Sequence, residues 1–268
     1  MSDFLQQMAM HSTERASKIG TIEIAALEKP VVSLQLSEFD VIAEIKGRSP
    51  AEGELAGSEL DRAEQARQYA GGGAVAISVL TEPSRFDGAL EHLEEVVAAV
   101  PDTPVMCKDF LVEPVQILAA RRAGASGVLL IATMLDDDKL RAMLDCAWEQ
   151  GMFVLLECFD EADLERVDHL LDYPPDADHA AGGTLLVGVN TRNLRTLDVD
   201  NERLQRLAPM LPDARCVAES GLGIADDAAT AAGLGYRLAL VGTALMRSDD
   251  PADLIAAMCA AGRAGVTL

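Results

Sequence analysis

The chain has 268 residues, of which 49% are hydrophobic and only 4% aromatic, a composition that supports one large aliphatic core and excludes disorder as the main state. It has 44 acidic and 22 basic residues, and the resulting formal charge of −22 argues against nucleic acid or anionic membranes as partners. The sequence has neither an apolar run long enough to span a membrane nor an apolar N-terminus typical of a signal peptide, so we expect a cytoplasmic protein.

The first part of the chain predicts an N-terminal helical extension, residues 1–38. A helix is expected over Ser2–Lys18, and a second short helix before Pro30. Because this segment precedes the first strand-like run, we expect it to cap the main domain or to cover a substrate.

Eight apolar runs follow, each typical of a buried strand: residues 41–45, 74–80, 105–108, 127–131, 153–157, 185–189, 215–219 and 237–241. The segments between them have helical spacing and start signals, and they predict helices at Ser58–Tyr69, Gly88–Ala99, Glu113–Ala123, Asp136–Gln150, Glu161–Leu171, Asn201–Leu207 and Ala225–Ala232. A short helix is expected near Ala244, and Asp249-Asp250-Pro251 opens a last helix. A loop without chemistry is expected at Tyr173–Thr184, which contains Pro174-Pro175 and Gly182-Gly183.

Strict alternation of strands and helices implies parallel strands with right-handed crossovers, and eight such units close into a barrel. We therefore predict an α/β fold, a (β/α)8 TIM barrel with an N-terminal helical extension. It forms one domain over residues 1–268, in which residues 39–268 are the barrel. A doubly wound open sheet is the alternative, but no GxGxxG follows the first strand.

Polar side chains recur where the predicted strands end: Glu44 and Lys46, Lys108, Glu157, Asn190, and Glu219 with Ser220. Buried charges are costly unless they are paired, and barrel enzymes build their sites at the C-terminal ends of their strands. Any one of these residues could be a salt bridge or a rim group; as a set they predict a polar active site. Glu44 and Lys46 are two residues apart, so both point to the same face and can pair with each other.

Glycine-rich turns follow the last two strands, at Ser220-Gly221-Leu222-Gly223 and at Gly242-Thr243. Backbone N–H groups at such turns form the phosphate site common in barrels, although each glycine alone could instead serve a tight turn. The four histidines and five cysteines show no metal-ligand spacing, so we expect no metal and no cofactor, with the cysteines as reduced thiols.

The ordered motifs together resemble one family, the indole-3-glycerol-phosphate synthases of tryptophan biosynthesis. The matching stretches are Ile42-Ala43-Glu44-Ile45-Lys46 with Arg48-Ser49-Pro50, Ser78-Val79-Leu80-Thr81-Glu82, Lys108-Asp109-Phe110, Gln116 with Ala120-Arg121, Leu129-Leu130-Ile131, Leu156-Glu157, Gly188-Val189-Asn190-Thr191-Arg192-Asn193-Leu194, Glu219-Ser220-Gly221, and Val241-Gly242-Thr243-Ala244-Leu245-Met246-Arg247. They run along most of the chain.

The resemblance implies closure of 1-(2-carboxyphenylamino)-1-deoxyribulose 5-phosphate to indole-3-glycerol phosphate, with loss of carbon dioxide and water. Lys108 matches the general acid, while Glu157 and the pair Glu44 and Lys46 are candidates for the proton shuttle. Lys46 and Arg192 would hold the substrate carboxylate, Asn190 would orient the intermediate, and Phe110 would pack the aromatic ring. The remaining matches to phosphate or substrate contacts are Ser49, Glu219, Ser220, Gly221, Gly242 and Thr243.

Two departures from the family pattern concern the phosphate side. Ala51 stands where the family usually has serine, and Thr243 stands where serine is frequent. Two other interpretations stay open: an aldolase-type lyase with a Schiff-base lysine, and a phosphometabolite-binding barrel without chemistry. A phosphoribosylanthranilate isomerase would be a nearer neighbour in pathway and fold, but Cys107 argues against it. The isomerase works with a cysteine and an aspartate, and Cys107 should point away from the barrel interior.

The charge pattern also predicts adaptation to salt. Only 5 of the 22 basic residues are lysines and 17 are arginines, which together with the acidic surface suggests a salt-filled cytoplasm and a halophilic source. We expect a phosphorylated small molecule as the partner of a monomer or weak homo-oligomer, with no nucleic acid and no membrane.

Overall fold

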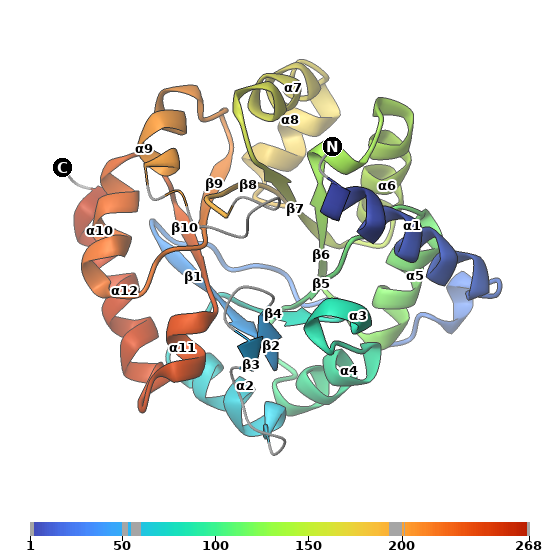
Figure 1. The fold of residues 1–268 in the computed structure, drawn as a ribbon, viewed down its shortest axis with the longest axis horizontal. Coiled ribbons are helices and arrows are strands. Elements are labelled where there is room, and N and C mark those ends of the chain that lie inside the picture. The colour runs from blue at the N-terminus through green and yellow to red at the C-terminus, as the bar shows by residue number, and fades with distance from the viewer. Residues whose placement is uncertain (1–2, 50–52, 55–59, 193–199, 201, 267–268) are drawn as a thin grey trace.

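A closed barrel of eight parallel strands forms the centre of the computed structural model, which describes residues 3–49, 53–54, 60–192, 200 and 202–266 (Figure 1). The strands are β1 Asp40–Ile45, β4 Ala76–Leu80, β5 Val105–Lys108, β6 Gly127–Ile131, β7 Phe153–Cys158, β8 Leu185–Asn190, β9 Arg215–Glu219 and β10 Leu238–Val241. Neighbours in sequence pair around the ring, and β1 closes it by pairing with both β4 and β10. The predicted (β/α)8 barrel is confirmed.

The helices that cover the barrel are α2 Arg62–Gly71, α3 Pro83–Phe86, α4 Leu90–Ala99, α5 Pro114–Ala123, α6 Asp137–Glu149, α7 Glu161–Leu171, α8 Pro174–Ala181, α9 Arg203–Leu207, α10 Ala225–Gly233, α11 Thr243–Arg247 and α12 Pro251–Val266. Aspartate side chains begin three of them: Asp61, Asp136 and Asp160 each accept a hydrogen bond from the backbone N–H three residues later. Such caps satisfy donors that have no partner inside the helix. The predicted starts at Ser2, Ser58 and Asn201 lie outside the described residues.

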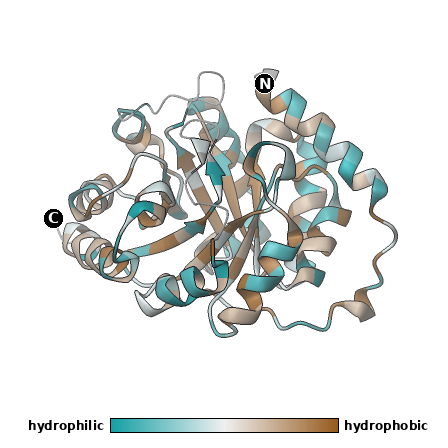
Figure 2. Ribbon diagram, turned by 60° about the horizontal axis from the view of Figure 1, so that its bottom comes forward, coloured by the Kyte–Doolittle hydropathy of each residue, from teal (hydrophilic) through white to brown (hydrophobic). Residues whose placement is uncertain are grey.

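The core is aliphatic and fills the barrel and the layer between strands and helices. Figure 2 shows brown, apolar residues along the central strands and more teal, hydrophilic residues on the surrounding helices. Every residue of β1, β4, β6, β7 and β8 is buried, because strands of a parallel barrel are covered on both faces. The strand predicted from residue 74 begins at Ala76 instead, because the Ala74 N–H donates to the Tyr69 carbonyl and so belongs to the end of α2.

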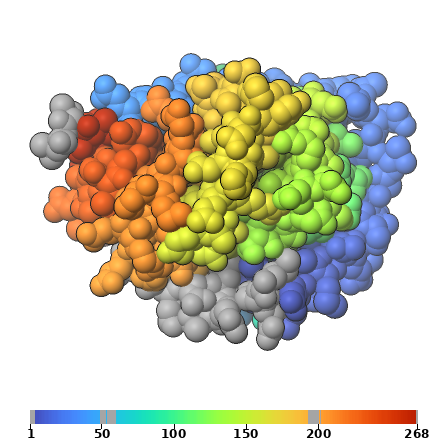
Figure 3. All heavy atoms as spheres, turned by 90° about the horizontal axis from the view of Figure 1, so that it is seen from above, coloured from blue at the N-terminus to red at the C-terminus, as the bar shows by residue number. Residues whose placement is uncertain are grey.

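The predicted loop at Tyr173–Thr184 is wrong, because residues Pro174–Ala181 form helix α8. Its two prolines occupy the first turn, where a fixed φ and a missing N–H suit a helix start. Asp176 is fully buried, and both of its carboxylate oxygens accept hydrogen bonds from Arg141 of α6, at 2.7 and 2.5 Å. This segment is therefore a packed part of the outer layer, in which α7 and α8 appear in yellow (Figure 3).

The N-terminal extension contains α1 Asp3–Lys18 and a short 3-10 helix, η1 Ile24–Ala26. Leu5 and Met8 bury one face of α1, and Ser12 accepts a hydrogen bond from Gln116 of α5 at 2.8 Å.

The remaining elements are small. A two-stranded sheet, β2 Arg48–Ser49 with β3 Gly53–Glu54, follows β1, and two more 3-10 turns are η2 Ala132–Met134 and η3 Ala208–Met210. In the described part of the chain, the helices are too short or too polar to cross a bilayer.

Candidate active site

A cavity of about 400 Å³ opens at the C-terminal ends of the barrel strands. All eight strands contribute to its wall, either through their last residues or through the residues that directly follow them. Parallel strands bring their C-terminal ends to one rim, so residues far apart in sequence meet there. A cavity of this size suits a small organic ligand.

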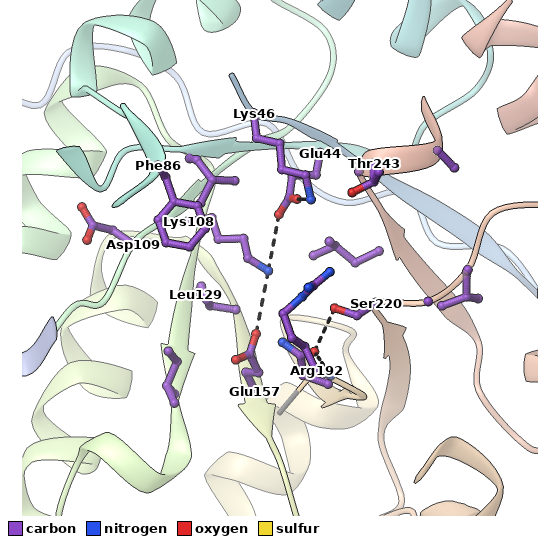
Figure 4. Close-up of a pocket in the computed structure, with 18 of the residues that line it drawn as sticks. Glu44, Lys46, Phe86, Lys108, Asp109, Leu129, Glu157, Arg192, Ser220 and Thr243 are labelled. Atoms are coloured by element: carbon purple, nitrogen blue, oxygen red, sulfur yellow. Dashed lines mark hydrogen bonds and ion pairs between the residues drawn. The ribbon is translucent and has the colours of Figure 1, made fainter. Parts of the chain in front are cut away.

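Lys108, at the end of β5, lines this cavity and lies among three carboxylates, two of which, Glu44 and Glu157, are labelled in Figure 4. Its Nζ is 3.3 Å from Glu219 Oε2, 3.5 Å from Glu44 Oε2 and 3.8 Å from Glu157 Oε2. Burial favours the neutral amine, yet the three carboxylates together outweigh that effect and raise the pKa of Lys108 above its ordinary value. The resting site therefore holds Lys108 as an ammonium ion.

Glu44 and Lys46 form the ion pair predicted from their spacing on β1. Glu44 Oε1 lies 2.8 Å from Lys46 Nζ, and both side chains line the cavity. Burial alone would raise the pKa of Glu44, but Lys46 and Lys108 together lower it to about 2. Glu44 is therefore a weak base that fixes two lysines.

Gly242 leaves room for this pair. A Cβ atom at Gly242 would stand 2.5 Å from Glu44 Oε1 and 2.9 Å from Lys46 Nζ, closer than real side chains approach. Its φ is −123°, so no left-handed turn requires glycine here. The close approach of two charged side chains explains the residue.

Asn190, at the end of β8, has its amide orientation determined by neighbouring donors. Its Oδ1 accepts hydrogen bonds from the Arg192 backbone N–H and from Ser220 Oγ, both at 2.9 Å. A backbone N–H can only donate, so the accepting atom must be the oxygen. The Asn190 NH2 group remains as a donor for a bound molecule.

One end of the cavity is apolar and aromatic. Phe110, which is 8% exposed, contacts Phe4 of α1 edge-on at 5.9 Å between ring centres and Phe86 of α3 at 6.2 Å. Leu129 and Ile131 line the same cavity from β6. Among these residues only Phe110 is predicted as a site residue from the sequence. For Phe4 the apolar face of the first helix was the available signal.

The other end carries the glycine-rich turns. Ser220 and Gly221 both have positive φ, 67° and 79°, so the chain turns sharply where β9 ends. Ser220, Gly221, Gly242 and Thr243 line the cavity, and so does Arg247 of α11. Arg247 lay inside a matched sequence stretch but was not predicted as a site residue.

The other residues named in the sequence comparison divide into three groups: those that line the cavity, those that do not, and those whose side chains are not described. Arg192 lines the cavity, whereas Glu219 is 1% exposed and lies behind Lys108 without lining it. Ser49 has no described side chain, and Ala51, Asn193 and Leu194 lie outside the described residues. Cys107 is buried with its Sγ 3.3 Å from Thr81 Oγ1 and does not line the cavity.

Arg15 fastens the N-terminal helix to the rim of the barrel. Its guanidinium lies 2.5 Å from Asp109 Oδ1 and 3.4 Å from Glu82 Oε1, and both carboxylates are buried. Glu82 also caps α3, which carries Phe86, and Asp109 stands between Lys108 and Phe110. One side chain thus connects the three segments that bear the aromatic wall.

Replacing Arg15 by methionine should lower the free energy of unfolding by about 1–3 kcal/mol, because two buried carboxylates lose their cation while Arg15 itself is partly solvated. The Michaelis constant should rise severalfold, since Phe4 is then less firmly held. Chemical denaturation and steady-state kinetics measure both effects. Lys18→Met is the matched control, because Lys18 forms an exposed pair with Glu14 on the same helix. If Arg15→Met had the stability of wild type, Arg15 would not fasten the N-terminal helix to the barrel rim.

In the part of the chain that the structure describes, no three His, Cys, Asp or Glu side chains are grouped so that they could hold a metal ion. The carboxylates of the cavity instead surround an ammonium group.

Comparison with known proteins gives a consistent result. The family model described as indole-3-glycerol phosphate synthase matches residues 23–258. A protein of that name from Nocardioides sp. is 42% identical over 266 residues, which cover 96% of this chain and 97% of the relative. Another from Parafrankia sp. is 44% identical over 240 residues, covering 89% of this chain and 82% of the relative.

Among solved structures, 3-hexulose-6-phosphate synthase from Salmonella typhimurium superposes with a TM-score of 0.61 at 17% identity, over 85% of this chain and 100% of that one. A thiamine phosphate pyrophosphorylase from Pyrococcus furiosus gives 0.56 at 14% identity, over 85% and 97%. At these identities the likeness shows the barrel fold alone.

Proposed function

The chain belongs to the indole-3-glycerol phosphate synthase family, and we propose that the cluster around Lys108 performs the ring closure of that synthase. The enzyme is a carbon–carbon lyase of tryptophan biosynthesis. It converts 1-(2-carboxyphenylamino)-1-deoxyribulose 5-phosphate to indole-3-glycerol phosphate with release of carbon dioxide and water. The single observation that carries the proposal for the site is a lysine held by three carboxylates on the floor of a cavity with one aromatic and one glycine-rich end.

The two ends of the cavity match the two ends of this substrate. Its aromatic ring would pack against Phe110 and the neighbouring Phe86, and its phosphate would lie at the turns that contain Gly221 and Gly242. Ser220, Thr243, Arg247 and Ser49 are the proposed side-chain partners of the phosphate end. Because the protein carries a charge of −22, local cations rather than the overall field must attract this anion.

Ring closure requires a proton donor, and we assign this role to Lys108. As the aromatic carbon attacks the substrate carbonyl, the carbonyl oxygen becomes negative and takes a proton from the ammonium group of Lys108. Lys46 and Arg192 would hold the carboxylate until its bond to the ring breaks, when the electrons of that bond return to the ring system and carbon dioxide leaves.

Dehydration then requires an acid for the departing hydroxyl and a base for a proton of the CH2 carbon beside the ring nitrogen, because the indole product keeps its N–H. Among the cavity carboxylates, Glu44 is poorly suited as the base, because the lysines lower its pKa to about 2. We assign the base role to Glu157, and we assign to the Asn190 NH2 group the orientation of the hydroxyl that leaves.

The Schiff-base alternative is disfavoured by the charge state of Lys108. A lysine must be neutral to attack a carbonyl, and the surrounding carboxylates raise rather than lower its pKa. Borohydride treatment with substrate should leave the protein unmodified; covalent trapping would support an aldolase instead.

The function is tested by incubating the purified protein with the carboxyphenylamino-deoxyribulose phosphate and recording indole fluorescence. Growth of the signal at a rate proportional to enzyme concentration supports the proposal. Absence of turnover across a range of KCl concentrations, with substrate binding retained in calorimetry, would identify a binding barrel.

We further propose that the protein is suited to high salt. The chain carries 44 acidic and 22 basic residues, and the Debye length falls from about 10 Å at 0.1 M to about 3 Å at 1 M salt. Thermal unfolding followed by circular dichroism should therefore show a midpoint that rises with KCl over that range. Sucrose at equal osmolality serves as the control, because it does not screen charge. A midpoint independent of KCl would contradict salt adaptation.

We also propose a cytoplasmic location and a monomer or weak homo-oligomer. The five cysteines are all unpaired thiols, which suits a reducing compartment. Analytical ultracentrifugation measures the oligomeric state directly.

A further inference from the structure

Glu219 occupies an unusual position beneath the cavity. Its side chain is 1% exposed, and its Oε2 accepts a hydrogen bond from Lys108 Nζ at 3.3 Å. Its Oε1 is buried and has no hydrogen-bond donor among the described residues. An ionised carboxylate with one unsatisfied buried oxygen is costly, so the surroundings of Glu219 favour a neutral acid.

Gly188 creates the space for that oxygen. Gly188 lies on β8, level with Glu157 on β7, and two residues before Asn190, which is level with Glu219 on β9. A Cβ atom at Gly188 would overlap Glu219 Oε1 and would stand 3.1 Å from its Cδ. Even an alanine would push the Glu219 carboxyl group away from its present place.

The charges of the cluster point to one retained proton. Three carboxylates, Glu44, Glu157 and Glu219, meet two ammonium groups, Lys46 and Lys108. The carboxyl groups of Glu157 and Glu219 approach the same atom, Lys108 Nζ, at 3.8 and 3.3 Å, and the nearby Glu157 raises the pKa of Glu219. Two buried carboxyl groups this close to one cation favour a proton kept between them. With one proton retained, the five groups have no net charge.

Resting on the proposed function, we propose that Gly188 and Glu219 form one positioning unit for Glu157. Gly188 leaves the space in which Glu219 lies, and Glu219, as a neutral carboxylic acid, donates a hydrogen bond to Glu157 from behind. Glu219 is thereby a positioning residue and not the substrate ligand that the sequence predicts. Glu157 is held in one orientation, with its cavity face available to the substrate.

The pH range in which Glu219 keeps its proton depends on the groups around it. Burial raises the pKa of Glu219 to about 8, with Lys108 acting against the shift and Glu157 adding to it. Glu44 pairs with Lys46 and with Lys108, and the buried Cys158 thiol, whose pKa is raised by burial, stays neutral. Above about pH 8 Glu219 loses its proton, the hydrogen bond to Glu157 is lost, and kcat should fall.

The first test is Gly188→Ala, with Gly233→Ala on α10 as control, because a Cβ at Gly233 meets no atom within 4 Å. Gly188→Ala should lower kcat at least about tenfold and change the Michaelis constant less than about twofold, since Glu219 does not line the cavity. In a Glu219→Ala background the same substitution should cost almost nothing further, because the displaced carboxyl group is gone. The proposal would be overturned if Gly188→Ala had the kcat of wild type, or if the effects of Gly188→Ala and Glu219→Ala on kcat were fully additive.

The second test is Glu219→Gln, which keeps a neutral donor of the same shape. Its kcat at pH 7 should stay within about threefold of wild type, and the decline above about pH 8 should disappear. If Glu219→Gln loses as much kcat as Glu219→Ala, Glu219 acts as an ion and the proposal is wrong.

A third readout does not depend on the reaction. Because the folded-state pKa of Glu219 is raised from 4.5 to about 8, the wild-type protein loses stability from this group as the pH rises through that window. Glu219→Gln lacks this loss, so its free energy of unfolding relative to wild type should increase from pH 4.5 to pH 8. If the difference in free energy of unfolding between Glu219→Gln and wild type did not change with pH, Glu219 would not retain a proton. This test holds even if the protein failed to turn over the substrate.

Discussion

Replacing Lys108 by methionine should lower kcat by about 10²–10⁴-fold, the usual contribution of a positioned general acid. The physical reason is that Lys108 is the cation at which three carboxylates converge on the cavity floor, 3.3–3.8 Å from its Nζ. The same change removes a buried charge partner, so the free energy of unfolding at neutral pH should also fall. Initial rates of indole formation and chemical denaturation measure the two effects separately.

Lys108→Arg separates charge from proton donation. Arginine keeps the positive charge among Glu44, Glu157 and Glu219 but does not release a proton near neutral pH, so it should preserve much of the stability while kcat stays low. Lys139→Met is the surface control, since Lys139 pairs with Glu113 outside the cavity and is 46% exposed. Near-wild-type turnover by Lys108→Arg would show that the site needs a cation at this place and not an acid.

The second large effect is expected for Glu157→Gln, with kcat reduced by about 10²–10³-fold and the Michaelis constant little changed. Glutamine preserves the shape of Glu157 but cannot accept the proton that dehydration releases. Since decarboxylation precedes that step, a single turnover of the variant should release carbon dioxide well before indole fluorescence appears. Rapid mixing with parallel detection of both products measures this delay.

Glu161→Gln is the matched control for that experiment, because Glu161 lies at the surface, 48% exposed, and pairs with Arg206. If carbon dioxide and indole slow down together in Glu157→Gln, then Glu157 acts at ring closure or earlier, and the base of the last step must be sought elsewhere in the cavity.

The repeating part of the fold follows from local patterns. Short β-branched and leucine-rich runs, such as Leu185–Asn190, are buried on both faces and could be recognised one at a time, and their alternation with capped helices implies the barrel. The segment after α7 could not be recognised in this way. Pro174-Pro175 is typical both of a turn and of a helix start, and the deciding contact, Arg141 with buried Asp176, joins residues 35 positions apart.

The polar set of the site was also predictable in part. Lys108 and Asn190 are the last residues of their strands, Glu44 and Glu157 the second-last, and a barrel brings strand ends to one rim. Phe4 and Phe86 were not recognised, because isolated aromatic residues in helices indicate ordinary core packing. Only the docking of α1 against the rim, through Arg15 and Gln116, brings Phe4 to the cavity.

The sequence by itself determined the barrel, the rim that carries the chemistry and the family resemblance. The reason is that the alternation of strands with helices, and the residues at the strand ends, can be recognised from consecutive residues. The tertiary structure alone decided which side each polar group takes within the cluster. Glu219 ends its strand as Lys108 does, yet it lies behind Lys108 and against Gly188, while Asn190 presents its NH2 group outward. The stagger between strands and the room left by a missing side chain set these positions, and both depend on residues that are distant along the chain.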